Sequence, residues 1–281
     1  MQGGLLKAAV LLFSISSLSA SGAPIATILS YHQVEPGGVP QVKTVPRSGA
    51  ADTTAEEARY AISVDDFNAQ LDYLQQSGCH VIPLADLVDY IEGRRDALPS
   101  KPVVITVDDG WLSAYTQIFP VMQQRKLPFT LFIYPEVIGV SRAYVTWPQV
   151  VEMTNAGVDI ESHTFTHPFL TRDGTMSDDE YQKFLDHELG DSKAEIEKHI
   201  GKTVRFIAYP YSTYDAAVEQ AVARHGYEAA LYDRDYGALI GCGTPLMHLK
   251  RFPLTHGTTL EQFKAFLPPN AVAISAGRSG R

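Results

Sequence analysis

One apolar segment of this chain ends abruptly in two adjacent carboxylates. Val103–Val107 is a run of β-favouring residues, and Asp108, Asp109 and Gly110 follow it directly. A run of this kind, bounded by charge and glycine, is typical of a strand buried in a parallel sheet. In parallel α/β folds the chemistry lies at the carboxyl edge of the sheet, where such strands end. The segment therefore predicts both a fold class and the place of a functional site.

A second strand-like segment, Val158–Ser162, ends in His163 and is followed by His167. The i, i+4 spacing allows both imidazoles to lie on one face of a single helical turn, as two ligands of one ion require. Asp109 offers an oxygen ligand, and two imidazoles with one carboxylate leave positions for water and substrate. The two segments together predict a catalytic divalent-metal centre.

The neighbouring carboxylate of Asp108 is the candidate general base. A divalent cation acidifies water and polarises a carbonyl group, so a second carboxylate need only accept a proton. Taken singly, each motif has a simpler interpretation. Asp108–Gly110 is also typical of a turn, and His163 and His167 are also typical of helix capping or packing.

The composition is that of a globular protein with room for one large domain or two small ones. The chain has 281 residues, of which 45% are hydrophobic and 20% are charged, and a net charge of −9. This charge and the lack of a basic cluster argue against nucleic acid as a partner. Cys79 and Cys242 are too few for a disulfide scaffold, and the sequence does not decide whether they pair.

The N-terminus has the layout of a secretory signal. Lys7 precedes the apolar segment Ala8–Ile15, and small residues follow around Ala20 and Ala23. We expect cleavage after Ala20, because Pro24 would follow a cut at Ala23. The alternative is an uncut anchor, although the apolar part is much shorter than the ~20 residues of a spanning helix. We therefore expect an exported protein, periplasmic or secreted, with no transmembrane segment in the mature chain.

Strand-like and helix-like segments alternate along the rest of the sequence. This alternation is typical of βα units and a mainly parallel sheet. Residues 35–59 are rich in Pro, Gly, Ala and Thr and are expected to form a long surface loop. Ser63 is the expected N-cap of the first clear helix, and the longest helix is expected over Asp178–Ile200. No linker divides the chain, so we expect one domain over residues 21–270 and a disordered tail over 271–281.

At the two strand ends the chain resembles the polysaccharide deacetylases of carbohydrate esterase family 4. Their first motif, Thr-Phe-Asp-Asp-Gly, resembles Thr106–Gly110, and their second, His-Ser/Thr-x-x-His-Pro, resembles His163–Pro168. The resemblance extends over essentially the whole mature chain. It implies that Asp109, His163 and His167 bind the ion and that Asp108 is the base.

The third family motif, Arg-x-Pro-Tyr/Phe, is matched only in part. Ala208–Tyr211 keeps Pro-Tyr but has Ala208 in place of the arginine, and so resembles the Tyr-Pro-Tyr branch that acts on bacterial exopolysaccharides. By this resemblance the backbone N–H of Tyr211 would stabilise the oxyanion, and Pro210 would shape the loop. Arg251, which lies far along the chain, is our candidate for the missing charge; the alternative is an ordinary surface arginine.

The fifth motif, Leu-x-His, resembles Leu254–His256, which makes His256 the expected general acid. His256 alternatively caps the helix that begins near Thr258. His32, at the end of the first strand, resembles the Tyr-His pair often present there and is a second candidate for substrate contact or proton transfer. Trp111 is the best candidate for stacking on sugar rings. The fourth motif, Asp-x-x-Asp-Trp, is poorly represented by Asp233–Tyr236.

These observations and the resemblance predict a distorted (β/α)7–8 barrel and a metal-dependent deacetylase. The expected substrate is a GlcNAc-containing polysaccharide, with poly-N-acetylglucosamine favoured over peptidoglycan or chitin. The expected cofactor is one divalent ion, zinc by ligand type, with cobalt, nickel, manganese or iron as alternatives. Two other functions fit the same motifs: a glycan-binding protein that has lost turnover, and a metal amidase acting on small cyclic amides.

Overall fold

The structure is a computed structural model that describes residues 25–38, 58–233 and 239–268. The expected signal segment 1–20 and tail 271–281 lie outside the described residues, as does most of the expected loop 35–59. Among the described residues, no helix is long and apolar enough to cross a membrane.

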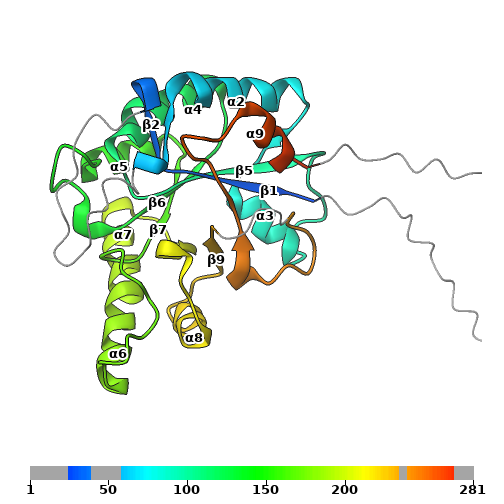
Figure 1. The fold of residues 1–281 in the computed structure, drawn as a ribbon. Helices are drawn as coiled ribbons and strands as arrows, with labels where there is room; N and C mark the ends of the chain where they lie inside the picture. The colour runs from blue at the N-terminus through cyan, green and yellow to red at the C-terminus, as the bar shows by residue number, and fades with distance from the viewer. Residues whose placement is uncertain (1–24, 39–57, 234–238, 269–281) are drawn as a thin grey trace, which may run out of the picture.

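The centre of the molecule is a parallel sheet of nine strands (Figure 1). Its order is β10-β9-β8-β7-β6-β5-β1-β11, with β4 paired to the start of β5. The strand after each helix returns in the same direction, as the alternation of segments predicts. The strands are β1 (Thr27–Tyr31), β4 (His80–Val81), β5 (Pro102–Val107), β6 (Thr130–Ile133), β7 (Asp159–Ser162), β8 (Phe206–Ala208), β9 (Ala229–Tyr232), β10 (Leu249–Lys250) and β11 (Phe252–Pro253).

A single interrupted strand closes this sheet into a barrel. β10 pairs with β9 through Leu249 and Leu231, whereas β11 pairs with β1 through Phe252 and Leu29. Arg251 separates β10 from β11 and donates its backbone N–H to Tyr232 O at 2.9 Å. The two edges of the sheet therefore meet at Arg251, and the predicted distorted α/β barrel is confirmed.

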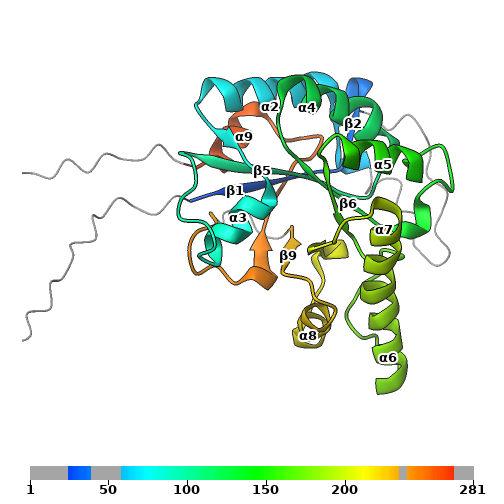
Figure 2. The same ribbon diagram turned by 180° about the vertical axis from the view of Figure 1, so that it is seen from behind.

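Helices cover the outside of the barrel (Figures 1 and 2). The helix that begins after Ser63 is capped as predicted, because the Ser63 hydroxyl accepts the Asp66 N–H at 2.9 Å. A short parallel pair that the sequence analysis did not anticipate, β2 (Gln33–Glu35) with β3 (Ala61–Ser63), precedes it. The α-helices are α2 (Val64–Gln76), α3 (Leu84–Ile91), α4 (Phe119–Arg125), α5 (Trp147–Asn155), α6 (Asp178–Leu185), α7 (Ser192–Ile200), α8 (Ala216–Arg224) and α9 (Leu260–Phe266).

The predicted long helix over 178–200 is present but contains a widened turn. A π-helical segment, η4 (Asp186–Asp191), joins α6 directly to α7. Figures 1 and 2 show α6 extending beyond the body of the molecule, whereas α7 packs beside the sheet. A π turn inserts a residue into the helix and changes the direction of the side chains around it.

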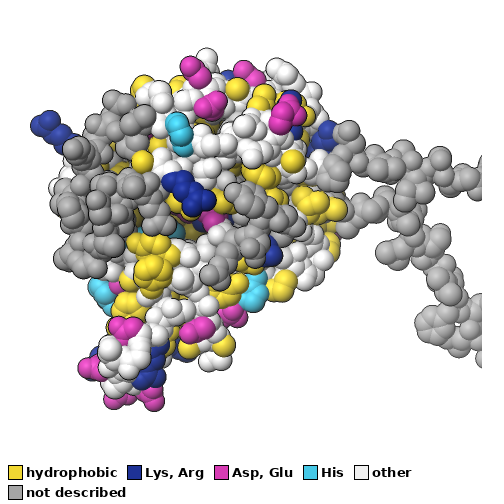
Figure 3. Space-filling view, in the orientation of Figure 1, with side chains coloured by type: hydrophobic (Ala, Val, Ile, Leu, Met, Phe, Trp, Pro, Cys, Tyr) yellow, Lys and Arg dark blue, Asp and Glu magenta, His cyan; other side chains and the backbone are white. Residues whose placement is uncertain are grey.

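Two apolar layers hold these elements together. The barrel interior is filled by alternate strand residues such as Ile28, Val104, Phe132 and Leu231. The opposite faces of the same strands pack against the helices, so both faces of the sheet are buried, as is usual for parallel sheets. On the face drawn in Figure 3, acidic and basic side chains are interspersed. Cys79 and Cys242 are both free thiols.

Candidate metal and catalytic centre

The carboxyl ends of the strands bring a layer of polar side chains into the mouth of the barrel. Alternate residues of a strand face the same side. The apolar interior layer is therefore followed by Thr106 on β5, by Asp108 directly after β5 and by His163 directly after β7. The backbone N–H of Asp108 donates to Tyr31 O at 2.9 Å, and that of His163 donates to Ile133 O at 2.8 Å. The backbone pairing of the sheet thus continues one residue past β5 and β7, and it fixes the positions of Asp108 and His163.

Asp109, His163 and His167 converge on one point. The His163 Nε2 and His167 Nε2 atoms are 3.1 Å apart, and Asp109 Oδ1 lies 3.6 Å from the first and 3.4 Å from the second. Ligand atoms bound to a tetrahedral ion at about 2.05 Å are separated by about 3.3 Å. The three donor atoms therefore fit a single divalent cation, as the sequence predicts for these residues.

His163 is oriented for coordination through Nε2. Its Nδ1 lies 2.8 Å from the carbonyl oxygen of Ala208, which can only accept, so Nδ1 carries the proton and Nε2 presents a lone pair. Burial of the ring lowers the pKa of His163 and favours the neutral form. A neutral imidazole is the form that binds a metal ion.

Trp111 orients the third donor, Asp109. The indole N–H donates to Asp109 Oδ2 at 2.9 Å, which leaves Oδ1 turned toward the two imidazoles. The Trp111 side chain stacks on Tyr144 with ring centroids 4.5 Å apart, and the residue is only 3% exposed. The ring is thus buried against Tyr144 and bonded to Asp109, so we propose that Trp111 positions this carboxylate; a stacking role toward sugar rings stays a prediction.

The second motif does not form the helical turn that the i, i+4 spacing suggests. Residues 163–168 are irregular, and Thr164 and His167 both have left-handed backbone conformations, with φ of 67° and 60°. The backbone N–H of His167 donates to Thr164 Oγ1 at 3.1 Å. The two imidazoles meet because the loop folds back on itself.

Asp108 is clamped by Arg251. Arg251 Nη1 donates to Asp108 Oδ1 at 2.8 Å and Nη2 donates to Oδ2 at 2.6 Å, and both side chains are almost fully buried. Burial alone would raise the pKa of Asp108, but the charge and the hydrogen bonds of Arg251 hold it below its usual value. The carboxylate that the motifs predict as the base is thus ionised at neutral pH.

Asp233 is a residue of the site whose place the sequence analysis did not identify. Its Oδ1 accepts the Nε–H of Arg251 at 2.8 Å, and its Oδ2 accepts the hydroxyl of Ser30 at 2.9 Å. The buried guanidinium is therefore bound on two sides by carboxylates. The sequence shows an acidic residue at position 233, but its role depends on the contact with Arg251, which only the folded structure reveals.

Of the two histidines considered as proton donors, the structure brings His32 to the site. His32 Nε2 lies 4.0 Å from Asp108 Oδ2, and the His32 ring stacks on Tyr60. His256 is an exposed residue whose backbone N–H donates to Arg59 O. Within the described part of the chain, no hydrogen bond or ion pair joins the His256 ring to the Asp108 or Asp109 carboxylate.

The partial third motif lies on the other side of the histidines. Tyr211 has a φ of 53°, and its ring centroid is 4.8 Å from that of His167. Pro210 is buried beneath this turn. The 37% exposed Tyr211 also stacks on Phe169, which is 60% exposed, at 4.2 Å. The motif therefore places a backbone turn and an open aromatic surface beside the candidate metal ligand His167.

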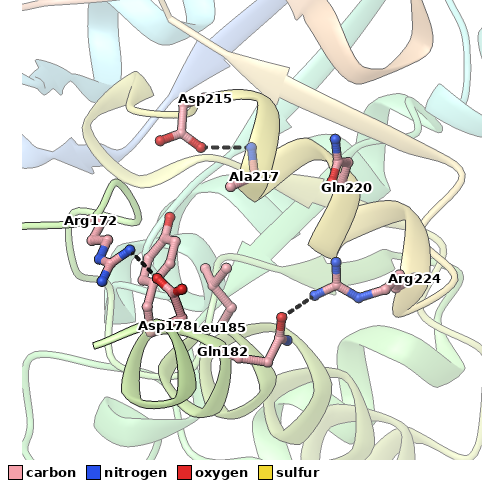
Figure 4. Close-up of a pocket in the computed structure, with 9 residues that line it drawn as sticks. Arg172, Asp178, Gln182, Leu185, Asp215, Ala217, Gln220 and Arg224 are labelled. Atoms are coloured by element: carbon pink, nitrogen blue, oxygen red, sulfur yellow. Dashed lines mark hydrogen bonds and ion pairs between the residues drawn. The ribbon is translucent and has the colours of Figure 1, made fainter. Parts of the chain in front are cut away.

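A pocket of about 370 Å³ between α6 and α8 is separate from this centre. Figure 4 shows that its charged residues already have partners, with Arg172 paired to Asp178 and Arg224 bonded to Gln182. None of the predicted site residues lines it. Its lining consists of Arg172, Asp178, Tyr181, Gln182, Leu185, Asp215, Ala217, Gln220 and Arg224.

Residues 95–230 match the family model described as polysaccharide deacetylase. The chain is 26% identical over 203 residues to YxkH of Bacillus subtilis strain 168, whose name assigns it provisionally to the polysaccharide deacetylases; the match covers 72% of this chain and 68% of that protein. It is 25% identical over 179 residues to the poly-β-1,6-N-acetyl-D-glucosamine N-deacetylase of Staphylococcus epidermidis, with 62% of this chain and 61% of that protein covered. The match thus spans less than two thirds of the staphylococcal enzyme.

The fold is also similar to a solved structure, that of IcaB from Ammonifex degensii. The TM-score is 0.68 at 26% identity, and the match covers 87% of this chain and 97% of that one. Residues 95–230, which match the family model, contain both strand-end motifs, Asp108–Gly110 and His163–His167. Residues 95–230 therefore form a polysaccharide deacetylase domain.

Proposed function

We propose that the protein is a metal-dependent hydrolase that removes N-acetyl groups from a GlcNAc-containing polysaccharide. The observation that carries this proposal is the convergence of Asp109, His163 and His167, whose donor atoms lie 3.1 to 3.6 Å apart. A second carboxylate, that of Asp108, lies beside them, with its Oδ2 3.9 Å from His163 Nε2. A metal centre with an adjacent ionised base is suited to hydrolysis of an amide.

A divalent cation bound by these three side chains would polarise the acetamide carbonyl and acidify a water molecule. Two imidazoles and one carboxylate suit zinc, and they also accept cobalt, nickel, manganese or iron. Metal identity is therefore a property to be measured, by analysis of the purified protein and by reconstitution.

In the proposed reaction, separate side chains beside the three metal donors carry out the proton transfers. Asp108, kept ionised by Arg251, accepts the proton of the attacking water, and the backbone N–H of Tyr211 stabilises the oxyanion that forms on the acetamide. His32 donates a proton to the departing amine, because its Nε2 lies 4.0 Å from Asp108 whereas His256 is exposed. Acetate and a glucosamine unit result.

The favoured substrate is a poly-N-acetylglucosamine exopolysaccharide. Support comes from the likeness to the staphylococcal poly-β-1,6-N-acetyl-D-glucosamine N-deacetylase and to IcaB, and from the Tyr209–Tyr211 variant of the third motif. The signal-like segment 1–20 supports export, so we propose that the enzyme acts in the periplasm or outside the cell. Sequencing of the N-terminus of the mature protein tests export independently.

The deciding experiment measures acetate release from three substrates: a β-1,6-linked GlcNAc oligomer, a chitin oligomer and peptidoglycan. We expect release chiefly from the first, and a loss of about 10²- to 10⁴-fold in Asp108→Asn, which keeps the shape of the base but cannot accept the proton. Release from none of the three by metal-loaded protein would refute deacetylation. Preferential release from chitin or peptidoglycan would refute only the choice of polysaccharide.

A further inference from the structure

Glu188 is a buried carboxylate outside the catalytic layer that contacts the loop between the two metal-binding histidines. It lies in η4 and is only 2% exposed. Its Oε2 accepts the backbone N–H groups of Phe165 and Thr166 at 3.0 and 2.9 Å, and its Oε1 accepts the Thr166 hydroxyl at 2.7 Å. Three hydrogen bonds from one carboxylate thus end on the two residues midway between His163 and His167.

The loop that Glu188 binds has an unfavourable backbone conformation. Thr164 and His167 both have positive φ, which non-glycine residues keep only where their surroundings hold them in place. Ser192, at the start of α7, supports the same loop, because its hydroxyl donates to Thr164 O at 2.8 Å. The conformation that brings the two Nε2 atoms within 3.1 Å of each other is therefore fixed from the helix behind it.

The widened turn that carries Glu188 is itself held by neighbouring residues. Leu189 O accepts the hydroxyl of Tyr227 at 2.9 Å. Gly190 lies under the ring of His225, where a Cβ atom would approach the ring to 2.9 Å. These contacts stabilise η4, and the widened turn of η4 directs the Glu188 side chain toward residues 165–166.

From these contacts we infer that Glu188 is a positioning residue for the metal centre. It fixes the loop between His163 and His167, so that both imidazoles are preorganised for one divalent cation. The inference rests on the proposed function, because it assumes that the three donors bind such an ion. Groups that orient metal ligands typically change metal affinity by about 10- to 100-fold when they are removed.

The test measures Co²⁺ binding to metal-free protein in competition with a chromogenic chelator, with wild type, Glu188→Ala, Glu188→Gln and Glu197→Ala. Glu197 is the matched control: it lies further along the same continuous helix and accepts a backbone N–H, that of Val204 at 2.9 Å, away from the site. We expect Co²⁺ affinity to fall at least about tenfold in Glu188→Ala. In Glu188→Gln, whose amide can keep the contacts, it should stay within about threefold of wild type, and in Glu197→Ala it should not change.

A purely structural role predicts a different result. Both alanine variants would then melt at lower temperature, and Co²⁺ affinity of the folded protein would not change. Affinity of folded Glu188→Ala within about twofold of wild type would overturn the inference. If Glu188→Ala does not fold, Thr166→Val removes only the bond to Oε1; we expect about threefold weaker binding, and unchanged binding would overturn the inference. Wild type that binds no Co²⁺ would instead refute the proposed function.

Discussion

The guanidinium of Arg251 binds the Asp108 carboxylate through two hydrogen bonds, of 2.6 and 2.8 Å, across 143 positions of sequence. Removing it would leave a buried charge without its partner, which typically costs about 3–5 kcal/mol of stability. We expect Arg251→Met to lose about this much and to reduce acetate release at least about 100-fold. Urea unfolding and an acetate assay measure the two effects.

A surface arginine supplies the control for that variant. Arg95 pairs with Asp86 at 2.9 Å, but its side chain is 44% exposed. Arg95→Met should cost less than about 1 kcal/mol and leave turnover unchanged. Unchanged turnover in Arg251→Met would show that Arg251 does not serve the base.

Removal of the metal should abolish activity. On the proposed mechanism Asp109, His163 and His167 bind one ion, so dialysis against a chelator should stop acetate release and lower the melting temperature, and added Zn²⁺ or Co²⁺ should restore both. Metal analysis of the same samples provides the measurement. A fully active preparation that contains no metal would contradict the mechanism.

Trp111 should control metal affinity rather than substrate affinity. Trp111→Phe keeps the stacking on Tyr144 but removes the hydrogen bond to Asp109 Oδ2, so we expect Co²⁺ binding about tenfold weaker. Trp147→Phe is the matched control, because Trp147 stacks on His199 at 3.8 Å, on helix α7. A raised KM with unchanged Co²⁺ affinity in Trp111→Phe would point back to a sugar-binding role.

The two candidate proton donors can be separated by glutamine substitutions. We expect His32→Gln to reduce kcat for acetate release by about 10²-fold or more, because a positioned acid contributes at least this much. His256→Gln should stay within about threefold of wild type, since His256 is exposed. The reverse order of effects would assign the acid to His256, as the Leu254–His256 motif suggests.

Acid should weaken an ion-pair network on the outer surface. Glu228 accepts two hydrogen bonds from Arg205, each of 2.7 Å, and these lower the pKa of Glu228. A carboxyl group with a lowered pKa adds stability above its unfolded pKa, and that stability is lost as pH falls through the folded value. Glu228→Gln should therefore destabilise by less than about 1 kcal/mol at pH 7, and the difference should start to shrink as pH falls below the unfolded pKa of about 4.3 and vanish below the lower folded pKa. A difference that grows in acid would contradict this assignment.

The sequence predicts the strand-end positions well because they follow from periodicity. Val103–Val107 and Val158–Ser162 were predicted to be strands of one parallel sheet, and such strands end at one edge, so Asp109 and His163 were expected at the same edge. The contribution of Asp233 was not predictable, because it depends on Arg251, which the barrel brings from another strand. The helical turn expected over 163–167 was wrong for a similar reason: Glu188 and Ser192 stabilise a loop that local spacing does not specify.

The place of Arg251 between β10 and β11 has a consequence for truncated chains. The segment around Arg251 pairs with both β9 and β1, and the Arg251 side chain binds Asp108, so closure of the sheet and the counter-ion of the base depend on the same short segment. A nascent polypeptide that has not yet reached residue 251 lacks the counter-ion for its buried acid. A chain truncated before residue 251 would therefore lack both the closure of the sheet and the partner of its buried carboxylate, and we expect it to release no acetate.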